Sequence, residues 1–82
     1  MEIKMKYEIA IPEFAEGAEE INLRQWLVAI GDTVKKGDNI AEAATDKISI
    51  YIESPADGIL SAILAQEDDR VLVGQIIGEI EG

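Results

Sequence analysis

The sequence contains an internal repeat, and this repeat limits the possible fold more than any other feature. A shift of 37 positions aligns residues 31–42 with residues 68–79. The identical positions fall at turns or at alternating apolar places. We therefore predict two similar half-domains that pack face to face as a sandwich of two small antiparallel sheets. Five of the twelve aligned pairs are identical: Asp32/Asp69, Val34/Val71, Gly37/Gly74, Ile40/Ile77 and Glu42/Glu79.

Short strands separated by turns describe the rest of the chain. Residues 21–30 have a mixed apolar spacing that also permits an amphipathic helix, but the Gly31-Asp32 turn and the repeat favour a strand with a β-bulge. Residues 14–20 are predicted to form an exposed loop, and no segment is typical of a helix. The predicted strands cover residues 7–11, 21–30, 33–36, 48–53, 59–64 and 75–80.

The length and composition narrow the classes of function. Residues 1–82 are predicted to form a single domain with one thin core. The net charge of −10 disfavours nucleic acid as a partner, and it fits solubility and an acidic docking surface equally well. Because the sequence has no histidine and no cysteine, it lacks the commonest general base and the strongest nucleophile of enzymes. Neither a bilayer-spanning run nor a secretory signal is evident.

One short segment, Ala44-Thr45-Asp46-Lys47-Ile48, lies between two strand-like stretches and suggests a chemical function. We expect a hairpin that closes on Asp46 and Lys47. Because neither central residue is glycine, a type I turn is favoured over the primed types. Lys47 would then point from the tip into solvent. The repeat aligns the region of Lys47 with the place where the chain ends meet, so Lys47 should lie opposite the termini.

The same hairpin has a predicted register. Ile40 falls on the wrong face in this register, so a β-bulge is expected near Ala41. The outward face should hold Ala44 together with Ser49, Tyr51 and Glu53. The other face should pair small residues with isoleucines, in the order Thr45 with Ile48, Ala43 with Ile50 and Ala41 with Ile52.

A lysine that projects from a rigid turn is suited to holding a cofactor on a flexible tether. Acylation of the amine by a carboxylic-acid cofactor gives a neutral amide, and the fixed base raises the local concentration of the cofactor's reactive end at several active sites in turn. The cofactor and the partner enzymes would supply the chemistry. Taken alone, however, an exposed lysine is most often only a solvated charge.

Several segments stand in a fixed order along the chain, namely Ile11-Pro12-Glu13-Phe14-Ala15-Glu16-Gly17, Leu23-Arg24-Gln25-Trp26, residues 31–38, Thr45-Asp46-Lys47, Pro55-Ala56-Asp57-Gly58 and Gly74-Gln75-Ile76-Ile77. Together they resemble the lipoyl domain of the dihydrolipoyl acyltransferase component of 2-oxo-acid dehydrogenase complexes. The resemblance covers about residues 7–81. The ordered set is specific, whereas Asp-Lys alone would not be.

The resemblance implies an all-β fold, a flattened barrel (a barrel-sandwich hybrid) of two four-stranded antiparallel sheets with a pseudo-two-fold repeat. It also implies that Lys47 carries lipoate, with Thr45, Asp46 and Ile48 presenting the lysine at the tip. The lipoyl group would be a swinging arm that carries acyl groups and reducing equivalents between active sites. The domain itself would be a non-catalytic carrier, monomeric when isolated.

The partners that the resemblance implies are a 2-oxo-acid decarboxylase, the acyltransferase catalytic domain, dihydrolipoyl dehydrogenase and a lipoate-attaching ligase, with no nucleic acid and no membrane. The compartment would be a bacterial or archaeal cytoplasm or the mitochondrial matrix. Two alternatives stay open. Biotinyl carrier domains share the fold, but methionines flank their lysine where Asp46 and Ile48 flank Lys47. An unmodified docking module is the other alternative, and the intact Thr-Asp-Lys tip argues against it.

Two more residues carry expectations. Trp26 is expected in the core rather than in a binding role, because its repeat partner is Ile63 and its neighbours are apolar. Ala44 is a departure from the resemblance, because the family commonly has glutamate three residues before the lysine. We expect this replacement to affect how well a given ligase recognises the domain, so Ala44→Glu should speed lipoylation by a ligase adapted to typical family members.

Overall fold

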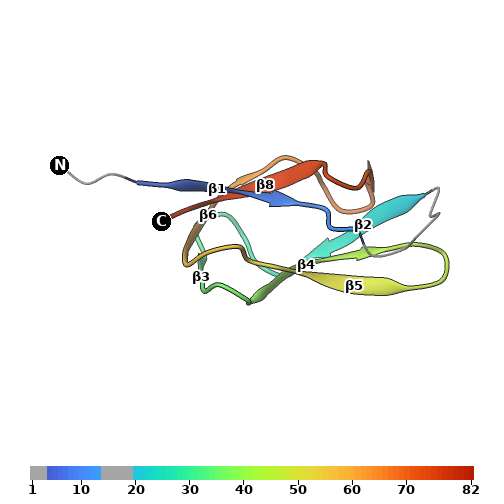
Figure 1. The fold of residues 1–82 in the computed structure, drawn as a ribbon, viewed down its shortest axis with the longest axis horizontal. Coiled ribbons are helices and arrows are strands. Elements are labelled where there is room, and N and C mark those ends of the chain that lie inside the picture. Colours follow the sequence, from blue (N-terminus) through green and yellow to red (C-terminus); the bar gives the residue numbers. More distant parts are fainter. Residues whose placement is uncertain (1–3, 14–19) are drawn as a thin grey trace.

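A computed structural model describes residues 4–13 and 20–82, and these residues form eight strands (Figure 1). They contain no helix of the length and apolar character needed to cross a membrane. Except for Glu20, the loop predicted at residues 14–20 lies outside the described residues. The strands are β1 (Lys6–Ala10), β2 (Ile21–Trp26), β3 (Thr33–Val34), β4 (Asn39–Ala44), β5 (Ser49–Glu53), β6 (Gly58–Ile63), β7 (Arg70–Val71) and β8 (Ile76–Glu81).

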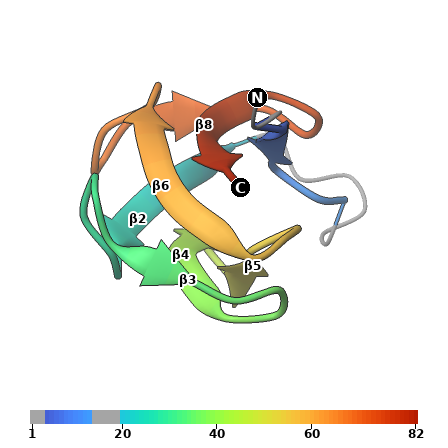
Figure 2. The same cartoon turned by 90° about the vertical axis from the view of Figure 1, so that its left-hand side faces the viewer.

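The strands form two four-stranded antiparallel sheets, with strand orders β1-β8-β6-β3 and β5-β4-β2-β7. Figure 2 shows the two sheets wrapped around a common interior. The shift of 37 positions that aligns the sequence repeat also carries β2, β3 and β4 onto β6, β7 and β8, residue for residue. The structure therefore confirms the predicted all-β sandwich and its repeat. It corrects the expected arrangement of the two halves, because β3 pairs with β6 and β7 pairs with β2, so each sheet contains a strand from the other half.

Each half-domain contains a turn held by an aspartate, at positions that the repeat aligns. Oδ2 of Asp32 accepts a hydrogen bond of 2.8 Å from the amide three residues earlier, and Oδ2 of Asp69 accepts an equivalent one of 2.9 Å. The residue before each aspartate has a positive φ, 97° at Gly31 and 72° at Asp68. Glycine adopts this conformation freely, and aspartate is one of the few other residues that tolerate it. The second half-domain thus forms the same turn with Asp68 in the place of Gly31.

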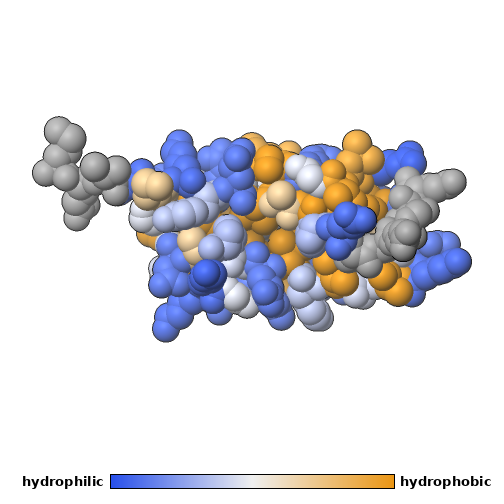
Figure 3. Space-filling model, viewed as in Figure 1, coloured by the Kyte–Doolittle hydropathy of each residue, from blue (hydrophilic) through white to orange (hydrophobic). Residues whose placement is uncertain are grey.

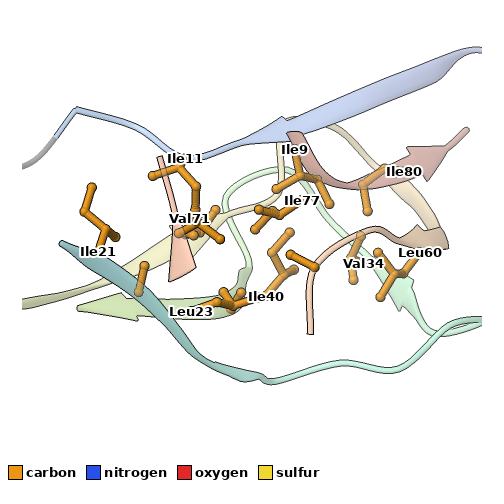
Figure 4. Packing of buried hydrophobic residues seen from close by; sticks show 14 residues of the cluster. Ile9, Ile11, Ile21, Leu23, Val34, Ile40, Leu60, Val71, Ile77 and Ile80 are labelled. Carbon is orange, nitrogen blue, oxygen red and sulfur yellow. The ribbon is translucent and has the colours of Figure 1, made fainter. Parts of the chain in front are cut away.

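One layer of aliphatic side chains joins the two sheets (Figure 4). Ile9 and Ile80 come from one sheet and Leu23 and Ile40 from the other, and none of them is more than 1% exposed. Successive side chains of a strand point to opposite faces, so each sheet presents one apolar face to this layer. Burial of apolar surface contributes roughly 25 cal/mol per Å², which makes the layer the main source of stability.

The two chain ends lie together at one end of the molecule, and the β4–β5 hairpin lies at the other end (Figure 1). Met5 and Gly82 exchange backbone hydrogen bonds of 2.8 and 2.9 Å. An ion pair of 3.5 Å between Lys4 Nζ and Glu81 Oε1 adds to the contacts at the chain ends. The hairpin that contains Lys47 therefore lies opposite the termini, as the repeat predicted.

Trp26 is half-buried, and the prediction that it lies inside the core needs this correction. Its ring packs against the core cluster, and its Nε1–H donates a 2.9 Å hydrogen bond to the carbonyl of Ala65. A Cβ added at Gly78 would come within 3.0 Å of the Trp26 ring. A buried indole N–H needs an acceptor, and the Ala65 carbonyl provides one at the edge of the core. Trp26 therefore closes the rim of the core.

Replacement of Trp26 by alanine should lower the free energy of unfolding by about 3 kcal/mol, the low end for a large aromatic residue, because part of the ring is already exposed. Urea denaturation followed by circular dichroism would measure the loss. Trp26→Phe keeps a ring but removes the donor to Ala65, and it should cost about 1–2 kcal/mol. Equal midpoints for Trp26→Ala and the parent protein would contradict the role assigned to this side chain.

Candidate functional site

The β4–β5 hairpin has the register that the sequence predicted. A β-bulge lies between Asn39 and Ala41, which is where the misplaced Ile40 required one. The bulge lets Ile40 and Ala41 both turn inward, so the alternation of buried residues resumes toward the tip. Backbone pairing and a turn hydrogen bond confirm the predicted partners, which are Ala41 with Ile52, Ala43 with Ile50 and Thr45 with Ile48.

The tip of the hairpin is held by the hydroxyl group of Thr45. Its Oγ1 accepts hydrogen bonds of 3.2 Å from the amides of both Lys47 and Ile48. The Thr45 amide in turn donates to the Ile48 carbonyl over 2.8 Å. Neither Asp46 nor Lys47 has a positive φ, which agrees with a turn of an unprimed type. One side chain therefore fixes the backbone of the lysine, a role that the residue types alone did not reveal.

Lys47 is exposed at this tip, beside an exposed Asp46. No carboxylate of residues 4–13 or 20–82 forms an ion pair with the Lys47 ammonium. The other four lysines belong to elements at the end with the termini, in or before β1 and in the turn after β3 (Figure 1). Lys47 is thus the lysine that the fold sets apart from the rest.

Two residues beside Lys47 differ from their predicted surroundings. Ile48 was expected to share the apolar face of Ile50 and Ile52, yet its side chain is 45% exposed whereas Ile52 is 3% exposed, because the core ends before the tip. Ala44 lies on the outward face opposite Ser49, as predicted, but it is only 4% exposed. It stands between Ser49 and Asn22 in the sheet, and its methyl group hardly rises above the backbone.

The turn between β7 and β8 gives the Lys47 end an apolar character that the sequence analysis did not predict. Leu72 is 66% exposed and Val73 is 49% exposed, where the repeat has Lys35 and Lys36. On the face shown in Figure 3, hydrophobic residues gather between the middle of the molecule and the hairpin end. A comparison of the two repeat-related turns would have revealed this difference from the sequence.

The chemistry available at the tip is that of a primary amine. A neutral amine is a nucleophile toward an activated acyl group, and the exposed position of Lys47 leaves it open to a second protein that brings such a group. The tip offers no histidine or cysteine, since the sequence has none. The arrangement therefore presents one accessible primary amine to a partner that carries an activated acyl group.

Comparison with known families and structures agrees with this geometry. The family model described as "Biotin-requiring enzyme", which covers biotin and lipoyl domains, matches residues 7–80. The solution structure of the lipoyl domain of the 2-oxoglutarate dehydrogenase complex from Azotobacter vinelandii is similar, with a TM-score of 0.72 and 30% identity. The similarity covers 89% of this chain and 92% of that domain.

Longer proteins contain the same region. The dihydrolipoyllysine-residue succinyltransferase component of the 2-oxoglutarate dehydrogenase complex of Staphylococcus saprophyticus is 41% identical over 78 residues, which are 92% of this chain and 18% of that protein. The dihydrolipoyllysine-residue acetyltransferase component of the pyruvate dehydrogenase complex of Corynebacterium glutamicum is 42% identical over 73 residues, which are 89% of this chain and 11% of that protein. The chain thus spans less than a fifth of these relatives.

Removal of the Thr45 hydroxyl should loosen the tip while the barrel stays folded. Thr45→Val leaves the Lys47 and Ile48 amides without their acceptor, so their hydrogen exchange should accelerate roughly fivefold, as expected for the loss of about 1 kcal/mol. In Thr45→Ser the hydroxyl is kept, so these amides should exchange at the parent rate. Unchanged exchange in Thr45→Val would refute the role assigned to the Thr45 hydroxyl.

Replacement of Lys47 by alanine should leave the free energy of unfolding within about 0.5 kcal/mol of that of the parent protein.

Proposed function

Because this chain belongs to the family of biotin and lipoyl domains, we propose that it is a lipoyl carrier domain whose Lys47 holds lipoate in amide linkage. One observation carries the proposal: the fold places Lys47 alone at an exposed hairpin tip, at the end opposite the other lysines. The tip backbone is fixed by Thr45, while the amine is open to solvent. A fixed base and an accessible amine are the two requirements of a tethered cofactor.

The attachment step uses only the Lys47 amine from this domain. Its nitrogen lone pair attacks the acyl carbon of an activated lipoyl derivative, the bond from that carbon to the activating group breaks, and the nitrogen loses a proton to solvent or to the ligase. A neutral amide replaces the ammonium, so the tip keeps Asp46 as its charged residue. Bound lipoate would supply a dithiolane that accepts acyl groups and reducing equivalents.

The rest of the domain serves to present that group. The relatives are acyltransferase components of 2-oxoglutarate and pyruvate dehydrogenase complexes, which supports the same setting for this domain. Its partners would be the 2-oxo-acid decarboxylase, the acyltransferase catalytic domain, dihydrolipoyl dehydrogenase and the attaching ligase. A tether anchored at a rigid tip gives each of these active sites a high effective concentration of the dithiolane. The domain itself would perform no catalysis, and its compartment would be that of the complex.

Biotin is the second candidate for the group on Lys47, since the matching family model includes biotin domains. Lipoate is favoured because Asp46 and Ile48 flank the lysine in place of methionines. The similar solved structure is also a lipoyl domain, and the relatives are dihydrolipoyllysine-residue proteins. An unmodified docking module would leave the separate, rigidly based lysine without a purpose.

Coexpression with a lipoate ligase should add one lipoyl group to the domain, because only one lysine lies at the tip. Intact mass would count the groups, and peptide mapping should place the group on Lys47. Lys47→Arg should abolish the addition, whereas the matched control Lys35→Arg should not. Biotin on Lys47, or lipoate on Lys35 or Lys36, would show that the proposal is wrong.

A further inference from the structure

The strand pair β4–β5 at the hairpin end and the strand pair β8–β1 at the chain ends have the same register. The chain ends therefore provide a comparison for the surroundings of Lys47. In the hairpin, Ala44 pairs with Ser49, and at the chain ends Glu81 pairs with Lys6. The β-bulge of the β4–β5 ladder recurs at the equivalent place in the β8–β1 ladder. The repeat aligns position 44 with position 81, so the two ladders correspond pair by pair.

The correspondence continues past the ends of the strands. The Thr45 amide donates to the Ile48 carbonyl over 2.8 Å, and the Gly82 amide donates to the Met5 carbonyl over 2.9 Å. In each case a lysine directly precedes the residue whose carbonyl accepts the hydrogen bond. The hairpin tip and the chain ends therefore hold lysines at corresponding positions, Lys47 and Lys4.

The two lysines differ in one neighbour. Glu81 Oε1 lies 3.5 Å from Lys4 Nζ, whereas Ala44 takes the place of Glu81 in the hairpin. Lys47 has no such ion pair with any described residue. We infer that Ala44 keeps the Lys47 amine free of an intramolecular ion pair and thereby sets how readily this amine is acylated. The inference rests on the proposed function, because it concerns the lysine that the proposal assigns to the cofactor.

An ion pair at this position would slow acylation. Only the neutral amine has a lone pair for attack on an acyl carbon, and a paired carboxylate stabilises the ammonium form. The pair would also hold the side chain against the sheet, away from an incoming donor. Exposed ion pairs are weak, so we expect a graded loss of reactive amine of roughly two- to fivefold. Asp46 adds a background charge that is the same in all variants of position 44.

The chain ends show how a glutamate lies at the position that corresponds to Ala44. Glu81 occupies the corresponding place between its strand neighbours Lys6 and Ile59, and it keeps about a third of its side chain exposed, at 31%. Ala44 pairs with the exposed Ser49 and lies outside the interior cluster, but it is only 4% exposed, so a glutamate there must displace what covers the methyl group. Glu81→Ala adds no atoms and therefore complements Ala44→Glu as a test of charge.

Acetylation by acetic anhydride tests the inference without any ligase. Ala44→Glu should slow acetylation of Lys47 roughly two- to fivefold at neutral pH, and molar salt should remove the difference. Ala44→Gln has the same shape without the charge and should react at the parent rate. Lys35 and Lys36 serve as internal standards in the same peptide digest. Circular dichroism would establish that each variant is folded.

The reciprocal substitution repeats the test at the chain ends. Glu81→Ala should speed acetylation of Lys4 by a similar factor, and it becomes the deciding variant if Ala44→Glu does not fold. Equal slowing of Lys47 by glutamate and glutamine, or unchanged rates at Lys47 and Lys4, would overturn the inference. Failure of a ligase to attach lipoate to Lys47 would count against the proposed function instead, because the acetylation rates do not depend on it.

Discussion

The aliphatic layer between the two sheets is the interaction on which the rest of the structure depends. Each sheet has one apolar face, and the apolar face of the other sheet covers it. The layer also decides where burial ends along the hairpin, since Ile52 is buried at the base while Ile48 is exposed at the tip. The hairpin is therefore anchored at one end by packing and shaped at the other end by hydrogen bonds to Thr45.

The sequence predicted most of the fold, because the repeat and the alternation of apolar residues both express the same packing requirement. The misplaced Ile40 was enough to predict the bulge beside Ala41, since a register must keep its apolar residues on one face. The partial exposure of Trp26 could not be predicted in this way. It depends on Ala65 and Gly78, which are distant in sequence and reach the indole only through the sheet pairing.

The sequence predicted which residue forms the candidate site, but it did not predict the hydrogen bonds and the burial of the residues around it. The hairpin signal located Lys47 and its place opposite the termini, because both follow from strand order. The two hydrogen bonds to Thr45 depend on a side-chain rotamer, and the burial of Ala44 depends on its cross-strand neighbours. The alternation of apolar residues predicts which face of the sheet a side chain lies on, but it does not predict the exposed fraction of that side chain.

The hairpin and the chain ends have the same strand register, although a turn joins β4 to β5 and none joins β8 to β1. The ladder from β8 to β1 is as complete as the ladder from β4 to β5, although no peptide bond links its ends. A circular permutant, joined from Gly82 to Met5 by a short turn and opened between Asp46 and Lys47, would keep the same eight strands in place. The covalent closure at the hairpin thus adds to a ladder that backbone hydrogen bonds already hold at the chain ends, and it fixes the backbone of Lys47.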